Sequence, residues 1–337
     1  MIVNAEEADM APFPALRRIE VIELGTSVAV AGAGRILRQL GLTVYHPQQD
    51  ELDPAIATYY QRGKLSFSDR VETEHDRRTI VLTDAASSAS TLPAELTDDV
   101  VVRVTPLGEA AIDVQPADEI AVAALAGLAH LTPRDIPFID ERSQPPLAMP
   151  GRLVSNYAAI ATAVAALAAV YSEVERRVDV DVSMLEVILP TLRREIAYYA
   201  YDGSVASRFM RVWRLAPWGV KPSRDGYFFV QVVEEHHWRG LVELMGSPEW
   251  ALDPDLLDPI IRFERRAEVD AKVAEWFATQ TNEDLVKMTT ERNLPFAAVN
   301  HPRDLIRMPQ IVHRGFVDRS TGDVDLSLPF HVRRAAA

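Results

Sequence analysis

Residues 19–46 read IEVIELGTSVAVAGAGRILRQLGLTVYH, and this stretch decides the fold. The mostly apolar run at 19–24 predicts a strand, and residues 28–40 carry apolar side chains at helical spacing. A second strand is predicted at 43–46. A strand, a helix and a strand within so short a stretch indicate a βαβ unit, in which the two strands run parallel.

The rest of the chain continues this alternation and then changes character. In the first half, further strands are predicted at 79–82, 100–104 and 178–182, and helices at 118–130, 156–173 and 184–201, the last interrupted by Pro190. After a break near 203–208, strands are predicted at 226–233 and 295–299, and helices at 235–245, 263–279 and 282–293. The pattern predicts an α/β fold with a parallel sheet, followed by a smaller α+β unit.

The composition limits the classes of function. The 337 residues include no cysteine, which excludes disulfides, thiolate nucleophiles and zinc–thiolate sites. The net charge of −14 disfavours nucleic acid and anionic membranes as partners. The apolar stretch at 157–171 is shorter than the roughly 20 residues of a membrane span, and the first residues lack a signal-peptide pattern. We therefore expect a cytoplasmic protein with no membrane and no nucleic-acid partner.

Three local patterns have ordinary structural explanations. Gly32 and Gly34 lie inside the predicted helix, and Leu37 replaces the third glycine of a dinucleotide fingerprint, so close helix packing is the better interpretation. His236 and His237 are neighbours that point about 100° apart on a helix, so they cannot chelate one metal together, and we expect no metal site. A basic cluster typical of a solvated helix face contains Arg262, Arg265 and Arg266.

Several short segments, in order along the chain, match one known family. They are RGKLS at 62–66, VVRVTPLG at 101–108, AALAGL at 123–128, VDVSMLE at 180–186, APWGV at 216–220, DGYF at 225–228 and FAAVN at 296–300. Together with the opening βαβ unit, they resemble the family III CoA-transferases, which include formyl-CoA and carnitine-CoA transferases and the alpha-methylacyl-CoA racemases.

The resemblance implies an architecture. Residues 1–205 and 300–337 would form a large Rossmann-like domain, and residues 206–299 a smaller α+β domain. Members of the family form interlocked dimers, so we expect a homodimer, or a heterodimer with a homologous CoA-transferase subunit.

The resemblance also places a catalytic position, and this chain departs from the family there. Family transferases use an aspartate at the start of the Ala-rich helix to attack the acyl-CoA thioester, and the matching residue is Asn156. An amide carries no anion and cannot perform this step. Ser155 is a candidate substitute, although no base is recognisable beside it. Racemases pair the aspartate with a histidine that aligns with Asp118, so racemase activity is less expected than transfer.

The CoA site implied by the resemblance is reduced as well. The loop that holds the nucleotide in the family aligns with Asp84, which puts an acid where phosphates would lie. We expect weak binding of CoA or an acyl-CoA as a ligand, and no covalently bound cofactor. The residues that would contact this ligand are Thr26, Ser27, Val28, Ala29, Lys64 and Asp84.

Three functional hypotheses follow, all within acyl-CoA and carboxylic-acid metabolism. The chain could be a CoA-transferase with an unrecognised nucleophile, a non-catalytic subunit of a heteromeric CoA-transferase, or a scaffold repurposed for a different acyl-ligand activity. The losses at the nucleophile and at the CoA contacts favour the second and third hypotheses.

Overall fold

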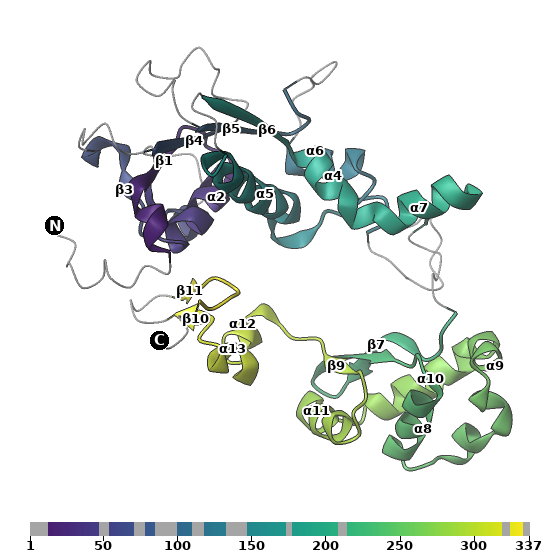
Figure 1. Cartoon of the computed structure of the whole chain (residues 1–337). Helices are drawn as coiled ribbons and strands as arrows, with labels where there is room; N and C mark the ends of the chain where they lie inside the picture. The colour runs from purple at the N-terminus through teal and green to yellow at the C-terminus, as the bar shows by residue number, and fades with distance from the viewer. Residues whose placement is uncertain are drawn as a thin grey trace, which may run out of the picture. The chain divides into compact units, whose positions relative to one another are not determined.

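The computed structural model describes residues 13–46, 54–70, 78–84, 100–109, 118–132, 147–172, 177–207, 214–318 and 324–332 (Figure 1). Contacts divide the chain into two compact units. The first comprises Met1–Arg134, Asp140–Arg208 and Asp318–Ala337, and the second comprises Asp135–Ile139 and Phe209–Val317.

The first unit contains a parallel sheet, as the sequence predicts. In order across the sheet, its strands are β3 (Leu65–Ser66), β2 (Thr43–His46), β1 (Ile19–Glu23), β4 (Arg78–Asp84), β5 (Val100–Thr105) and β6 (Val178–Ser183). Every neighbouring pair is parallel; Val21, for example, lies opposite Val44 on one side and Ile80 on the other. The strand order reverses between β1 and β4, which makes this a doubly wound sheet with its switch point there.

Two helices cover one face of this sheet. They are α2 (Val28–Gln39) and α5 (Leu153–Val170), which lie side by side in Figure 1. A Cβ on Gly32 would lie 2.8 Å from the Cβ of Ala159, so only glycine allows the two helices to approach so closely. This contact confirms the packing interpretation of Gly32. The core between sheet and helices includes Val21, Ile80 and Val102.

The remaining helices of the first unit connect these layers. They are α3 (Pro54–Gln61), α4 (Glu119–Leu125), α6 (Met184–Ile188) and α7 (Arg193–Asp202), with 3-10 turns η1 (Pro14–Arg18), η2 (Phe67–Asp69), η5 (Pro150–Arg152) and η6 (Leu189–Leu192). The helix predicted at 118–130 ends at Leu125, and Gly127 follows with a positive φ of 80°. The interruption predicted at Pro190 is confirmed, because that residue lies in the 3-10 turn η6 between α6 and α7.

The α5 helix is apolar on most of its surface. The stretch Pro150–Val170 is long and apolar enough to cross a membrane by length and composition, and half of it is buried inside the protein. Helices in the core of a globular domain have the same character. The buried half consists of small residues such as Ala158, Ala163 and Ala166, which lie against the sheet and α2.

The second unit is a small α+β structure. Strands β7 (Trp218–Ser223) and β8 (Gly226–Gln231) form an antiparallel hairpin, and β9 (Ala297–Ala298) pairs with β8. Its helices are α8 (Glu235–Leu244), α9 (Pro259–Glu264), α10 (Arg266–Phe277), α11 (Asn282–Glu291), α12 (Pro302–Leu305) and α13 (Pro309–His313), with 3-10 turns η7 (Glu249–Leu252) and η8 (Pro254–Leu257). Its core includes Phe228, Trp238 and Phe277. The chain then returns to the first unit at Asp318, and two short strands, β10 (Val317–Asp318) and β11 (Asp325–Leu326), pair with each other.

The prediction of a solvated face for the basic cluster is wrong for Arg262. Arg262 is only 1% exposed, and its guanidinium lies 5.1 Å from the ring centre of Trp238. The side chain donates to the carbonyl oxygens of Leu256 and Leu257, at 2.5 and 2.9 Å, and to that of Ala216 at 3.2 Å. Arg262 is therefore an internal donor for backbone oxygens that have no strand or helix partner there.

Candidate active site

The α5 helix begins in an unusual way. Gly151 and Arg152 both have a positive φ, 73° and 51°, and Arg152 at the cap position makes no side-chain capping bond. The cap comes instead from Glu119 of α4. One carboxylate oxygen accepts from the backbone N–H of Val154 at 3.1 Å, and the other accepts from the hydroxyl of Ser155 at 2.7 Å. A carboxylate from a neighbouring helix thus lies at the positive end of α5.

Asn156 is held at both ends of its side-chain amide. Its Nδ2 donates to the carbonyl oxygen of Gly151 at 2.8 Å, and its Oδ1 accepts from the hydroxyl of Tyr60 at 2.9 Å. A backbone carbonyl only accepts hydrogen bonds, so the amide nitrogen must be the atom that faces Gly151. An aspartate in the same rotamer would place a carboxylate oxygen against that carbonyl oxygen. The surroundings of position 156 therefore suit an amide.

Tyr60 brings α3 to this position. Tyr60 is 8% exposed and packs edge-on against Tyr59, with 5.0 Å between ring centres. Burial raises the pKa of the Tyr60 phenol, and the neighbouring Tyr59 and Glu119 act in the same direction, while the hydrogen bond to Asn156 and the charge of Arg152 oppose them. The phenol therefore stays protonated and donates at neutral pH. Tyr60 was not predicted as a site residue, because it lies 96 positions from Asn156.

The structure brings two of the three predicted catalytic residues together. Ser155 and Asn156 are adjacent at the start of α5, whereas Asp118 caps its own helix, its carboxylate accepting from the backbone N–H of Ala121 at 2.9 Å. No base was recognisable beside Ser155 in the sequence, and in the structure the carboxylate of Glu119 accepts a hydrogen bond from its hydroxyl. Glu119 immediately follows Asp118, the residue that the family resemblance placed at the histidine position of the racemases.

A second cluster lies at the switch point of the sheet. The backbone N–H groups of Thr26 and Ser27 both donate to one carboxylate oxygen of Asp84, at 2.8 Å each. Asp84 is the last residue of β4 and is 6% exposed. A Cβ on Gly25 would lie 2.7 Å from this oxygen, so the glycine makes room for the carboxylate. Val28, also a predicted contact, is buried in the first turn of α2 with Ala29.

The geometry of this cluster bears on anion binding. In doubly wound sheets, ligands bind outside the carboxyl ends of the strands at the switch point, and amides at a helix N-terminus receive their phosphates. In this chain two such amides already bind an internal carboxylate.

Lys64 is placed differently from the other predicted ligand contacts. Its side chain is fully buried, and its Nζ donates to a Glu23 carboxylate oxygen at 2.5 Å and to the carbonyl oxygen of Ala31 at 2.8 Å. Burial raises the pKa of Glu23 to about 7 and lowers the pKa of Lys64, and the ion pair opposes both shifts. The Lys64 ammonium therefore binds partners inside the fold. Across the described residues, no group of three or more His, Cys, Asp or Glu side chains could hold a metal ion.

The doubly wound parallel sheet of six strands defines an α/β protein with a Rossmann-like fold. A model of CoA-transferase family III matches residues 94–335, which is most of the chain. The chain belongs to CoA-transferase family III, as its sequence motifs predict.

Curated relatives match parts of the chain. The succinyl-CoA–D-citramalate CoA-transferase of Chloroflexus aurantiacus is 26% identical over 153 residues, which cover 44% of this chain and 38% of that protein. The formyl-CoA:oxalate CoA-transferase of Bradyrhizobium diazoefficiens is 25% identical over 85 residues, which cover 25% of this chain and 19% of that protein. The chain thus matches well under half the length of these relatives.

Solved structures match almost the whole fold. A CaiB/BaiF family protein from Brucella suis has a TM-score of 0.81 at 18% identity, covering 94% of this chain and 92% of the other. A hypothetical protein from Mycobacterium tuberculosis has a TM-score of 0.71 at 19% identity, covering 95% and 93%. These matches agree with the predicted fold class.

Proposed function

We propose that this chain acts in acyl-CoA or carboxylic-acid metabolism as a family III protein whose position 156 performs no covalent CoA transfer. Family membership supports the metabolic setting. The absence of covalent transfer at position 156 is supported by the hydrogen bond that Asn156 donates to the carbonyl oxygen of Gly151, since a carboxylate could not donate it. Losing a covalent nucleophile typically lowers the rate by a factor on the order of 10⁴ to 10⁶.

Weak binding of CoA is part of the same proposal. The Asp84 carboxylate occupies the amides of Thr26 and Ser27, so a phosphate at the switch point would have to displace it or lie beside a like charge. The Lys64 ammonium is committed to Glu23. A ligand of this unit would then be a CoA thioester held chiefly through its acyl and pantetheine parts, or a free carboxylic acid.

The test is an assay of CoA transfer with the purified chain. Succinyl-CoA is offered with a panel of carboxylic acids, and the wild type is compared with Asn156→Ala and Asn156→Asp. We expect little or no transfer by the wild type. Robust turnover that Asn156→Ala abolishes, and that Asn156→Asp fails to increase, would contradict the proposal. Turnover that requires co-expression with an aspartate-bearing homologue would identify the non-catalytic-subunit form.

A second candidate function rests on the bond between Ser155 and Glu119. In this alternative, the Ser155 oxygen attacks the thioester carbonyl carbon, Glu119 takes the hydroxyl proton, and the CoA thiolate leaves, to be protonated by Glu119. The product is an acyl ester on Ser155. Treatment with an acyl-CoA followed by peptide mass analysis distinguishes the two candidates. An acyl group on Ser155 that disappears in Ser155→Ala favours the second, and an unmodified peptide favours the first.

We also propose that the chain forms a dimer with itself or with a homologous subunit. The outer face of α5 supports this, because Tyr157, Ile160 and Val164 are spaced three and four residues apart and are 42%, 55% and 62% exposed. An apolar helix stripe of this kind is usually covered by another surface. A second family III subunit would cover it.

A further inference from the structure

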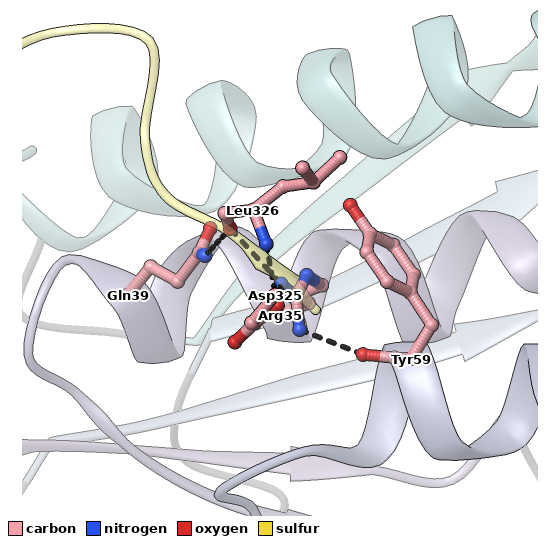
Figure 2. Close-up of polar contacts among 5 residues, drawn as sticks. All are labelled: Arg35, Gln39, Tyr59, Asp325 and Leu326. Carbon is pink, nitrogen blue, oxygen red and sulfur yellow. Dashed lines mark hydrogen bonds and ion pairs between the residues drawn. The ribbon is translucent and has the colours of Figure 1, made fainter. Parts of the chain in front are cut away.

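We infer that the C-terminal segment at β11 (Asp325–Leu326) positions the hydrogen-bonded pair of Tyr60 and Asn156, and that Arg35 connects this segment to the pair. Four residues besides Arg35 take part, and Figure 2 shows them around the guanidinium: Gln39 on α2, Tyr59 on α3, and Asp325 and Leu326 on β11. All belong to the first unit. The inference concerns geometry, so it stands or falls independently of the proposed function.

Arg35 joins the C-terminal segment to α2. Its Nη2 forms an ion pair with the carboxylate of Asp325 and also donates to the carbonyl oxygen of Leu326 at 3.1 Å. The same carbonyl accepts from the Gln39 side chain at 2.6 Å. Arg35 is 4% exposed, so its cation is buried and needs this carboxylate. The segment is therefore held by charge and by two donors at a single backbone oxygen.

The other side of the same guanidinium holds α3. Nη1 of Arg35 donates to the carbonyl oxygen of Tyr59 at 2.6 Å, and its carbon lies 4.0 Å from the Tyr59 ring centre. This carbonyl lies in the last turn of a short helix, where carbonyl groups have no partner within the helix. A planar guanidinium has fixed donor directions, so anchoring one edge on β11 determines where its other edge meets α3.

Tyr60 passes this placement to the candidate active site. It follows Tyr59 directly, and its hydroxyl donates to Oδ1 of Asn156 at 2.9 Å. A shift of the last turn of α3 by a fraction of an ångström would lengthen this bond, because Tyr60 is buried and packs edge-on against Tyr59, which restricts the side-chain rotation that could compensate. Asp325 and Arg35 therefore act on Asn156 indirectly, through the last turn of α3, as positioning residues.

NMR of the full chain with tyrosines carrying ¹³C at the ring carbon bonded to oxygen tests this inference at neutral pH. The Tyr60 line is assigned as the one missing in Tyr60→Phe, and Asn156→Ala shows where it lies when the phenol loses its acceptor. We expect Asp325→Asn to move the Tyr60 line from its wild-type position toward that of Asn156→Ala. Asp325→Glu, which keeps the charge, should restore most of the wild-type position.

Two further variants keep the test decisive. Gln39→Ala removes only one bond to Leu326 and should move the line less, in the same direction, so it replaces Asp325→Asn if that variant does not fold. Asp179→Asn removes a carboxylate from an exposed ion pair with Arg177 in the same unit and should leave the line unchanged. A Tyr60 line that keeps its wild-type position in folded Asp325→Asn and in Gln39→Ala would overturn the inference.

Discussion

The side-chain nitrogen of Asn156 lies 2.8 Å from the carbonyl oxygen of Gly151, and this contact separates an amide from the carboxylate it resembles in shape. In a site built around a reactive carboxylate, the same atom would be an oxygen and would be repelled. The local structure therefore suits an asparagine at this position, with the left-handed turn at Gly151 and Arg152 presenting the acceptor.

The first prediction concerns Asn156→Asp. We expect it to destabilise the fold by about 0.5–1.5 kcal/mol at pH 8, because the hydrogen bond to Gly151 is lost and a carboxylate oxygen then faces the carbonyl oxygen. A protonated acid can donate to Gly151, so the folded pKa of the new carboxyl lies above its unfolded value, and the loss should be smaller at pH 4.5. Urea unfolding at both pH values measures it, with Tyr60→Phe as a control that carries no new charge. Equal losses at the two pH values would contradict the prediction.

The second prediction concerns Asp84→Asn. The substitution keeps an oxygen for the amides of Thr26 and Ser27 but removes the charge that opposes a phosphate. We expect CoA to bind at least about tenfold more tightly, which corresponds to roughly 1.4 kcal/mol, as measured by calorimetry. Asp179→Asn makes the same change in net charge at an exposed position and should have no effect. Sub-micromolar binding by the wild type would show that Asp84 does not close the switch point.

The third prediction concerns the contact between α2 and α5. Gly32→Ala would place a methyl group 2.8 Å from the Cβ of Ala159, so we expect a loss of about 1–3 kcal/mol from overpacking. The double variant Gly32→Ala with Ala159→Gly returns the lost space and should recover part of the loss. Denaturant unfolding of the two single variants and the double variant measures this coupling, and additive effects would argue against direct contact.

The fourth prediction concerns the buried pair of Glu23 and Lys64. The pKa of Glu23 is raised from 4.5 to about 7 by burial, so the folded chain holds a proton that the unfolded chain releases in this interval. The contribution of Glu23 to the free energy of unfolding should therefore fall as the pH rises from about 4.5 to 7. Glu23→Gln should remove this dependence and cost about 3–5 kcal/mol by leaving Lys64 unpaired, while Glu23→Gln with Lys64→Met should cost much less. Unfolding curves over this pH range decide both points.

The fifth prediction concerns assembly. We expect light scattering at micromolar concentration to give twice the mass of one chain, and Val164→Glu to reduce it, because a charge in an apolar contact loses its hydration. Ala271→Glu adds the same negative charge at an exposed position of α10 and serves as the control. A compact monomer in the wild type would rule the dimer out.

Local patterns were sufficient to predict most of the first unit. The β1–α2–β2 unit was found because two short apolar runs flank a segment with apolar residues at helical spacing, and the parallel pairing follows from the crossover rule. Strand β7 was missed because Gly219 and Pro222 weaken its strand pattern, and it is stabilised by pairing with β8. Elements formed by tertiary pairing leave little trace in the local sequence.

The candidate site was less predictable for the same reason. The position of Asn156 came from the family motif, but its partners lie elsewhere in the sequence: Tyr60 is 96 positions away, and Glu119 is 36 positions from Ser155. Arg262 was assigned to a solvated face because most charged side chains are exposed. In the structure, its guanidinium is buried and donates to unpaired backbone oxygens. Sequence spacing gives no information about either kind of contact.

The ion pair of Arg35 with Asp325 also has a consequence for the order in which the protein is made. The two residues are 290 positions apart, so at about 5–20 residues per second a ribosome produces Arg35 roughly 15 to 60 seconds before its partner. Until then, α2 cannot bury its cation beside the carboxylate that it needs. The first unit is therefore completed last, after the whole second unit has been synthesised, and a nascent chain that stops early carries an unsatisfied arginine at its centre.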